Sequence, residues 1–238
     1  ALRTGMRQMA AEGDLGALFH SHPHGGRRHE RAVVAQHLER RGLQVTADQV
    51  LIANGAQQAL ATACTSFLMP GDVIAADALT YFGFKSLAQS LRLEIAAVPG
   101  DGVAMDIDAL ERLCQRRRIR AVYTMPTMHN PLGQVMSAER RQRLAAIARH
   151  RNLLLIEDAA FAFLAEPAPA PLFTHAPERC IYVSGLSKSV AAGLRFGMIA
   201  AAPELVPAMR DTIRNTTWSS PALSVALGCR WIETGEVD

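Results

Sequence analysis

Cysteine is scarce in this sequence of 238 residues, and its four cysteines stand far apart. No two of them form a CxxC pair, the spacing that zinc sites and redox pairs commonly use. We therefore expect reduced structural thiols, a cytoplasmic protein and no metal site. Apolar runs long enough to span a membrane are also lacking, and charged residues interrupt the apolar ones near residue 1, which is unlike a signal peptide.

A strong net charge is the second absence. The sequence has 25 lysine and arginine residues against 22 aspartate and glutamate residues, which leaves a net charge of +3. This excess is too small to indicate nucleic acid binding by itself. The arginine clusters fall in predicted helices or loops, where a solvated face is the simplest explanation. They lie at residues 27–28, 40–41, 116–118 and 140–141.

Hydrophobic residues, by contrast, make up 49% of the chain, and they recur in short runs between helical patterns. Strands are predicted at residues 50–53, 73–76, 92–98, 121–125, 153–156, 181–183 and 196–201. Helices are predicted at residues 2–18, 30–41, 106–117, 137–149, 205–216 and 223–234, with further helices ending at about 68 and beginning at 80. This alternation predicts a three-layer α/β/α fold with a mostly parallel central sheet. The wholly apolar run 153–156 is typical of a strand covered on both faces.

Three histidines stand in the predicted loop of residues 20–26, which proline and paired glycines mark. Such a cluster can bind a metal ion. No carboxylate or cysteine stands at ligand spacing beside these histidines, so packing within the loop is the better interpretation.

The stretch of residues 182–197 places one lysine, Lys188, among serines and glycines, and Arg195 follows seven residues later. Small neighbours leave room for a bulky partner at the amine, and desolvation favours the neutral, nucleophilic form of lysine. The nearby arginine suits a phosphate. An amine for an aldehyde and an arginine for a phosphate together indicate pyridoxal phosphate. The alternative is a surface lysine on a solvated loop.

Polar or aromatic residues also follow several other predicted strands. They are the turn at residues 54–57, Tyr81, Asn130 and Asp158. The turn opens a helix, so its free backbone N–H groups point at a site for an anion. Because ligands of parallel α/β sheets bind beyond the carboxyl ends of the strands, we expect these residues and Lys188 to meet at one edge.

With these residues in place, the chain resembles the large domain of a fold-type I pyridoxal-phosphate enzyme of the class I and II aminotransferase group. The resemblance covers nearly the whole length. Its carriers are residues 54–60 (NGAQQAL), 129–133 (HNPLG), 156–158 (IED) and 187–188 (SK), with Arg195. It implies that residues 1–45 lead into a cofactor-binding large domain at 46–238. It also implies a homodimer and a C-terminal small domain, absent from these residues, whose arginine would bind the substrate carboxylate.

The resemblance implies a role for each matching residue. Lys188 would hold the cofactor as a Schiff base and move a proton, and Asp158 would keep the pyridine nitrogen protonated. Asn130 would bind the 3′-oxygen of the ring and Tyr81 would stack on it. The implied catalytic residues are Lys188 and Asp158, and the cofactor-binding set is Gly55, Ala56, Gln57, Tyr81, Asn130, Asp158, Ser184, Ser187, Lys188 and Arg195.

Three positions depart from the family pattern. Phe161 stands where many relatives have a tyrosine that bonds the 3′-oxygen. Gly185, with Ser184 beside it, stands where a serine usually contacts the phosphate. Ser21 stands where a tyrosine often reaches the phosphate of the neighbouring subunit. These changes favour cofactor binding over efficient turnover.

Two kinds of protein fit this resemblance. Residues 23–31 (PHGGRRHER) and 177–188 (PERCIYVSGLSK) are most similar to the aminotransferase-like domain of MocR-type regulators of the GntR family. In such a regulator the domain would sense an amino acid or keto acid, and DNA would be bound only by a winged-helix domain that these residues do not contain. The alternative is a free-standing aminotransferase. A lyase or decarboxylase of the same fold is less favoured because of the Asn-Pro-Leu-Gly sequence.

Overall fold

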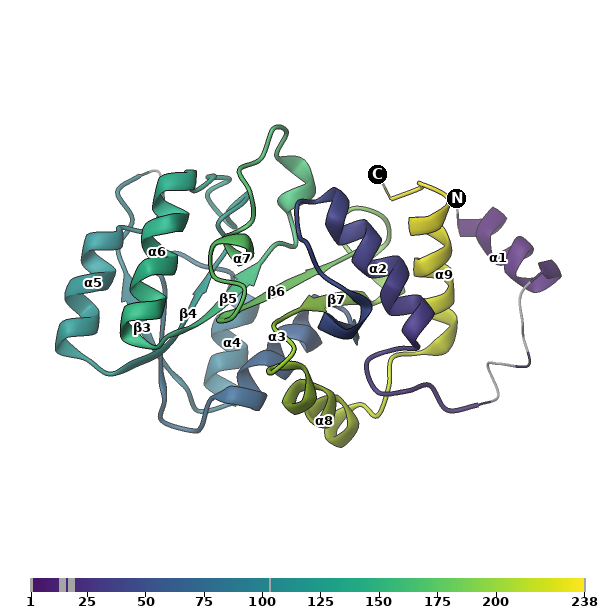
Figure 1. Cartoon of the computed structure of the whole chain (residues 1–238), viewed down its shortest axis with the longest axis horizontal. Coiled ribbons are helices and arrows are strands. Elements are labelled where there is room, and N and C mark those ends of the chain that lie inside the picture. The colour runs from purple at the N-terminus through teal and green to yellow at the C-terminus, as the bar shows by residue number, and fades with distance from the viewer. Residues whose placement is uncertain (1, 13–15, 17–19, 103, 238) are drawn as a thin grey trace.

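The computed structural model describes residues 2–12, 16, 20–102 and 104–237. A seven-stranded sheet runs through these residues in the order β1-β7-β6-β5-β4-β2-β3 (Figure 1). Its strands are β1 (Val50–Asn54), β2 (Val73–Asp77), β3 (Glu94–Val98), β4 (Ile119–Thr124), β5 (Leu154–Asp158), β6 (Cys180–Gly185) and β7 (Phe196–Ala200). Strand β7 is antiparallel to both β1 and β6, and the other pairs are parallel. The prediction of a mostly parallel sheet is confirmed.

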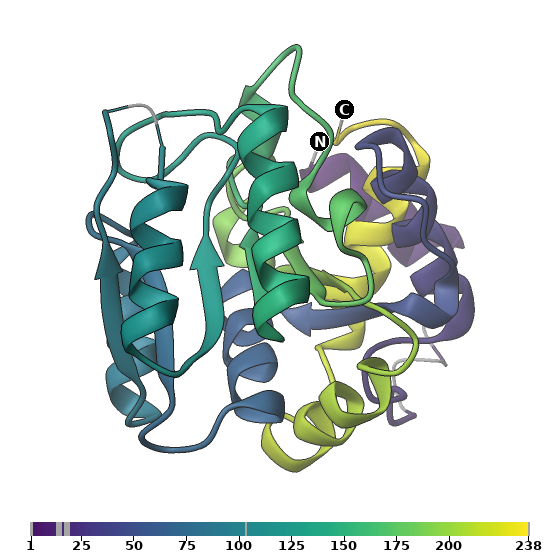
Figure 2. The ribbon, with the colours of Figure 1, turned by 60° about the vertical axis from the view of Figure 1, so that its left-hand side comes forward.

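Helices cover both faces of the sheet. One layer consists of α3 (Ala56–Phe67), α4 (Phe82–Ser90) and α8 (Val206–Thr216). The other consists of α2 (Arg28–Arg40), α5 (Ile107–Arg116), α6 (Ala138–Arg151), α7 (Leu172–His175) and α9 (Ala222–Glu233), with α1 (Leu2–Glu12) packed on α9. Figure 2 shows α5 and α6 side by side on this second face. The three-layer α/β/α fold is confirmed.

Local signals in the sequence explain where several helices begin. The side chain of Asp106 accepts hydrogen bonds from the backbone N–H groups of Asp108 and Ala109, so it caps α5. Ser137 caps α6 in the same way by accepting from Arg140 N–H. Helix α1 ends at Glu12, and most of the remaining predicted helix, residues 13–15 and 17–18, lies outside the described residues.

Several predicted boundaries are wrong by about two residues, and two of them have a local explanation. The strand predicted from Arg92 begins only at Glu94, because Arg92 has a φ of 57° and Leu93 N–H bonds back to the carbonyl of Ala88 in the α4 terminus. Helix α4 begins at Phe82 rather than at residue 80, because Tyr81 occupies its N-cap position.

The sheet separates two apolar clusters, and alternate residues of each strand face one or the other. In β5, Leu155 belongs to the cluster under α2, α6 and α7, whereas Ile156 belongs to the cluster under α3, α4 and α8. Glu157 and Asp158 continue this alternation, so these neighbouring carboxylates lie on opposite faces.

The histidine loop is held by hydrogen bonds. His22 Nε2 lies 2.8 Å from Glu30 Oε1, and both side chains are buried. His24 Nδ1 lies 2.6 Å from the carbonyl oxygen of Trp218. Packing, rather than metal binding, accounts for these two histidines. Of the helices in the described ranges, none has the length and apolar character needed to cross a membrane.

Candidate active site

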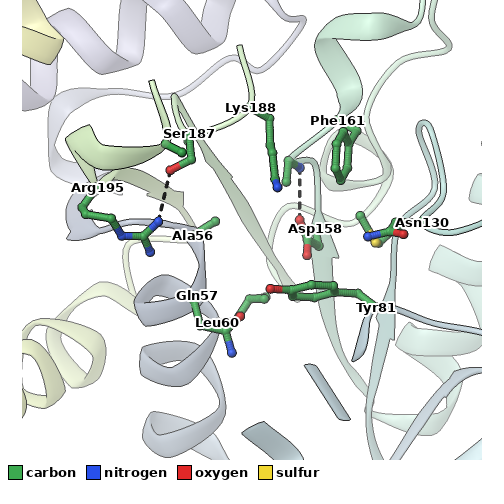
Figure 3. Close-up of a pocket in the computed structure, with 14 residues that line it drawn as sticks. Ala56, Gln57, Leu60, Tyr81, Asn130, Asp158, Phe161, Ser187, Lys188 and Arg195 are labelled. Carbon is green, nitrogen blue, oxygen red and sulfur yellow. Dashed lines mark hydrogen bonds between the residues drawn. The ribbon is translucent and has the colours of Figure 1, made fainter. Parts of the chain in front are cut away.

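A cavity of about 170 Å³ opens beyond the carboxyl ends of β4, β5 and β6. Figure 3 shows side chains from several distant segments directed into it. Eight of the ten predicted cofactor-binding residues line it: Ala56, Gln57, Tyr81, Asn130, Asp158, Ser187, Lys188 and Arg195. The structure therefore brings these residues together at the sheet edge where the strand pattern placed them.

Groups that attract an anion gather at one end of the cavity, which we call the anion end. Helix α3 begins at Gly55, which has a φ of 83°, and no described side chain caps its first N–H groups. Arg195 lies beside this helix end in the left-handed region, with a φ of 53°, and its Nη1 donates to Ser187 Oγ at 3.3 Å (Figure 3). The helix dipole, a guanidinium group and a hydroxyl group thus converge on one point.

Gly55 contributes to this end through its lack of a side chain. It does not line the cavity, but a Cβ atom built on it would overlap the guanidinium group of Arg195. Its positive φ also disfavours other residues. Gly55 therefore leaves the space in which Arg195 lies.

Asp158 lies at the end of β5 with both oxygens hydrogen-bonded. Oδ1 accepts from Ala160 N–H at 3.0 Å, and Oδ2 accepts from the hydroxyl of Tyr123 at 2.8 Å. Burial raises the pKa of the Asp158 carboxyl, and the two hydrogen bonds oppose this shift in part. Each oxygen can accept one more bond. Because no arginine or lysine of the described chain forms an ion pair with it, a cationic group in the cavity would stabilise the ionised form.

Tyr123 is a residue that the sequence analysis missed. It lies in β4, fully buried, and its ring stacks on Phe84 of α4 with centroids 3.6 Å apart. Burial, with Asp158 as the next cause, raises the pKa of its phenol well above the ordinary value, so it is a hydrogen-bond donor at neutral pH. The available signal was a hydroxyl-bearing residue inside an apolar strand.

Lys188 lies on the loop after β6, and its Nζ is 5.4 Å from the centroid of the Phe161 ring. The expectation that this lysine is desolvated is wrong for the described chain, since its side chain is exposed. The reason is that the loop carrying Lys188 forms the rim of the cavity rather than its base. Figure 3 shows the amine above Asp158 with the Phe161 ring beside it.

Ser184, like Gly55, is a predicted residue that does not line the cavity. Its hydroxyl donates to the carbonyl of Ala159 at 3.4 Å, and it lines a separate small cavity with Arg41 and Tyr182. Gly185 lines the main cavity instead. A Cβ atom on Gly185 would stand 2.6 Å from the carbonyl oxygen of Phe196, so the β6–β7 pairing leaves no room for a serine there.

Asn130 reaches the cavity from the loop after β4. This loop is closed by hydrogen bonds from His129 N–H to the carbonyl of Gln134 and from Gly133 N–H to the carbonyl of His129. In Figure 3 the amide of Asn130 lies near Asp158 and the Tyr81 ring. Asn130 and Tyr81 therefore border the same space from two sides.

Known proteins share this arrangement of sheet and helices. The family model "Aminotransferase class I and II" matches residues 6–229, nearly the whole chain. This chain belongs to the class I and II aminotransferase family. The resemblance seen in the sequence is thereby confirmed.

Proteins that resemble the chain include a transcriptional regulator and aminotransferases. An uncharacterized HTH-type transcriptional regulator of Bacillus subtilis, YdeF, is 33% identical over 84% of this chain and 44% of its own length. The solved structure of an archaeal alanine:glyoxylate aminotransferase superposes with a TM-score of 0.92 at 27% identity. LysN, an α-aminoadipate aminotransferase of Thermus thermophilus complexed with N-(5′-phosphopyridoxyl)-L-leucine, gives 0.88 at 26%. Both comparisons cover 99% of this chain and 60% of the solved one.

The chain thus spans less than half of the regulator and about three fifths of the solved aminotransferases. The family is shared by regulators and enzymes. The aminotransferase family domain is the part that the chain has in common with both.

Proposed function

We propose that this chain is a pyridoxal-phosphate-binding aminotransferase-type domain that joins the cofactor to Lys188 as a Schiff base. The observation that carries the proposal is the convergence of three groups in one cavity. An uncapped helix end with Arg195 suits the phosphate, buried Asp158 suits a protonated ring nitrogen, and the amine of Lys188 lies above them. Few other ligands combine an anion, a cationic ring and an aldehyde.

The residues present fit this cofactor. The family match and the phosphopyridoxyl ligand of LysN indicate pyridoxal phosphate, in agreement with the expectation from the sequence. When bound, pyridoxal phosphate supplies an electron sink for negative charge that develops at the Cα atom of an amino acid.

The protein's own groups hold the two ends of such a ligand. The N–H groups of Ala56 and Gln57, the hydroxyl of Ser187 and the guanidinium of Arg195 would bind the phosphate. Asp158, oriented by Tyr123 and Ala160, would keep the ring nitrogen protonated. Tyr81 would lie flat against the ring.

The remaining groups act at the other edge of the ring. Asn130 would donate to the 3′-oxygen, without the help of a second hydroxyl because Phe161 has none. The free amine of Lys188 would take a proton from the substrate Cα atom and return it. Its exposed position allows an amino acid to approach from the rim.

We assign this domain to a MocR-type regulator that senses an amino acid or keto acid. The similarity to YdeF and the loss of a hydroxyl at Phe161 support this choice. Within this proposal the protein is cytoplasmic and homodimeric, and DNA contact belongs to a winged-helix domain outside these residues. The second candidate is a free-standing aminotransferase, which the likeness to two solved aminotransferases favours.

The decisive experiment uses the fact that the sequence contains two lysines, Lys85 and Lys188. We expect pyridoxal phosphate to give a visible absorbance band that borohydride fixes, in the unchanged protein and in Lys85→Ala. Lys188→Ala should lack it. Lys85 is the matched control because it is exposed on α4 and does not line the cavity. A band that survives Lys188→Ala would disprove the Schiff base at this residue.

Adding single amino acids then separates the two candidates. Conversion of the cofactor to its pyridoxamine form, with release of a keto acid, indicates transamination. A stable spectral change without keto acid indicates sensing. The full-length protein should be measured alongside, since the substrate carboxylate site is not among the described residues.

A further inference from the structure

The start of helix α4 places an aromatic ring over a glycine. Tyr81 is the N-cap residue of α4, and Gly83 is the second residue of the helix and is buried. A Cβ atom built on Gly83 would stand 2.3 Å from Cζ and from the hydroxyl oxygen of Tyr81, which is closer than real Cβ atoms approach other atoms. The ring of Tyr81 thus folds back onto the backbone of its own helix.

Backbone conformation does not explain this glycine. Gly83 lies in α4, and its φ is not among the positive values that favour glycine. At a helical position alanine is the better residue, because glycine loses more conformational freedom on folding. The space taken by Tyr81 is therefore the structural reason for glycine at position 83.

A hydrogen bond fixes the same segment from the other side. Gln57 Nε2 donates to the carbonyl oxygen of Gly83 at 2.9 Å, which ties the start of α4 to the start of α3. The next residue, Phe84, stacks on Tyr123, the phenol that binds Asp158. The backbone under the Tyr81 ring is therefore attached both to the anion end of the cavity and to the carboxylate end.

Figure 3 shows what this arrangement does to the cavity. The Tyr81 ring spans the base of the cavity between Asn130 and Leu60, with its hydroxyl towards α3. Any side chain at position 83 would push the ring off the helix backbone and into the open cavity, where it is more accessible to solvent. The depth of the space above the ring is thus set by the absence of a side chain beneath it.

We propose that Gly83 is a positioning residue that holds the Tyr81 ring at the base of the cavity, and that it sets the position of the cofactor ring through Tyr81. The second half of this statement rests on the proposed function. The first half concerns only the protein's own residues and can be tested without any ligand.

The ligand-free test measures the reactivity of Tyr81. The sequence has three tyrosines, and Tyr123 and Tyr182 are buried. Nitration by tetranitromethane, followed by mass spectrometry of the peptides, therefore reports on Tyr81 selectively. We expect Gly83→Ala to nitrate at least about threefold faster at Tyr81, because the displaced ring turns towards solvent and becomes more accessible. An unchanged rate would overturn the proposal.

The ligand test is a double-mutant cycle on the dissociation constant of pyridoxal phosphate. We expect Gly83→Ala to raise this constant about tenfold, equivalent to about 1.4 kcal/mol. In a Tyr81→Ala background the same substitution should have no further effect. An equal effect in both backgrounds would show that Gly83 does not act through Tyr81 and would overturn the proposal.

Gly71→Ala is the matched control. Gly71 has a φ of 90°, but a Cβ atom built on it would have no other atom within 4 Å, so this substitution strains the backbone without touching the site. It should lower the denaturation midpoint and leave the affinity for pyridoxal phosphate unchanged. Gly83→Ala, in contrast, should weaken this affinity without lowering the denaturation midpoint. If no variant, including the unchanged protein, binds pyridoxal phosphate, the proposed function fails, and the nitration rates alone decide the role of Gly83.

Discussion

Two carboxylates stand next to each other in β5 and serve opposite faces of the sheet. Glu157 is 1% exposed and Asp158 is 2% exposed, so burial does not distinguish them. Glu157 accepts backbone N–H groups from Leu172 and Phe173, and it lies 3.9 Å from the guanidinium of Arg141. Asp158 accepts one N–H and one phenol, and it borders the cavity.

The difference between the two carboxylates lies in the partners that each one has within the protein. Arg141, beside Glu157, donates to the carbonyls of Met136, Ala170 and Pro126, so it links the connection between β4 and α6 to the segment before α7. Glu157 also borders a separate cavity of about 750 Å³, so access to a cavity does not distinguish the two carboxylates. Asp158 keeps free acceptor capacity on the side of the cavity. Glu157 has the guanidinium of Arg141 beside it, whereas no arginine or lysine of the described chain forms an ion pair with Asp158. This difference, and not burial or a raised pKa, separates the two carboxylates.

The largest expected effect removes the partner of Glu157. Arg141→Met should lower the free energy of unfolding by about 3–5 kcal/mol, because it leaves a buried carboxylate without its cation. The matched control, Arg143→Met, removes an exposed ion pair with Asp108 and should cost at most about 1 kcal/mol. Urea denaturation measures both. Equal losses of unfolding free energy would show that the buried pair of Arg141 and Glu157 stabilises the fold no more than an exposed ion pair does.

The second effect is on the pH dependence of folding stability. Burial, opposed by the N–H of Phe173 and by Arg141, raises the pKa of Glu157 from 4.5 to about 7. The folded state then holds a proton that the unfolded state has released, so the stability from this group is full below pH 4.5 and is lost as the pH rises through 7. The shift corresponds to about 3 kcal/mol. Glu157→Gln should remove most of this loss between about pH 5 and pH 8, as measured on the ligand-free protein.

A smaller effect compares the two carboxylates directly, by replacing each with its amide. At about pH 6, Glu157→Gln should cost about 1–3 kcal/mol of stability, because its amide nitrogen cannot accept a backbone N–H. It should leave the affinity for pyridoxal phosphate unchanged. Asp158→Asn should lower that affinity at least about tenfold, equivalent to about 1.4 kcal/mol, with little loss of stability. If Glu157→Gln also weakens cofactor binding, the two faces are not independent.

The smallest effect concerns the residue that orients Asp158. Tyr123→Phe removes one hydrogen bond from the carboxylate and should cost about 0.5–1.5 kcal/mol of stability. Without this donor the pKa of Asp158 rises further, so the loss of cofactor affinity on acidification should begin at a higher pH. A titration of affinity against pH compares the variant with the unchanged protein. An identical profile would limit Tyr123 to packing.

Much of the fold could be predicted because hydrophobic runs and helix caps are local signals. The sheet edge that gathers Asn130, Asp158 and Lys188 also followed from the order of strands. Contacts between distant segments were not predictable in this way. The bond from Tyr123 to Asp158 depends on the register of two neighbouring strands, which the sequence does not display. The same limit applies to Gly83 under Tyr81.

The misplacement of Ser184 has a related cause. The family pattern has a serine three residues before the lysine, at the position of Gly185, and Ser184 was the neighbouring candidate. The alternation of β6 decides which face each residue occupies, and it directs Ser184 to a separate cavity. The exposure of Lys188 likewise depends on the shape of a loop rather than on the residues within it. The sequence therefore predicted which residues are near the site more reliably than it predicted which way their side chains point.

The position of β7 has a consequence for how the molecule assembles. Strand β1 pairs only with β7 among the described strands, and this pairing joins residue 50 to residue 200. Until the ribosome has released β7, β1 has no strand to join, although it was made first. Closing so long a loop is entropically slow. The end of the cavity where Gly55 meets Arg195 therefore requires two segments about 140 residues apart, and it cannot form before both have been synthesised.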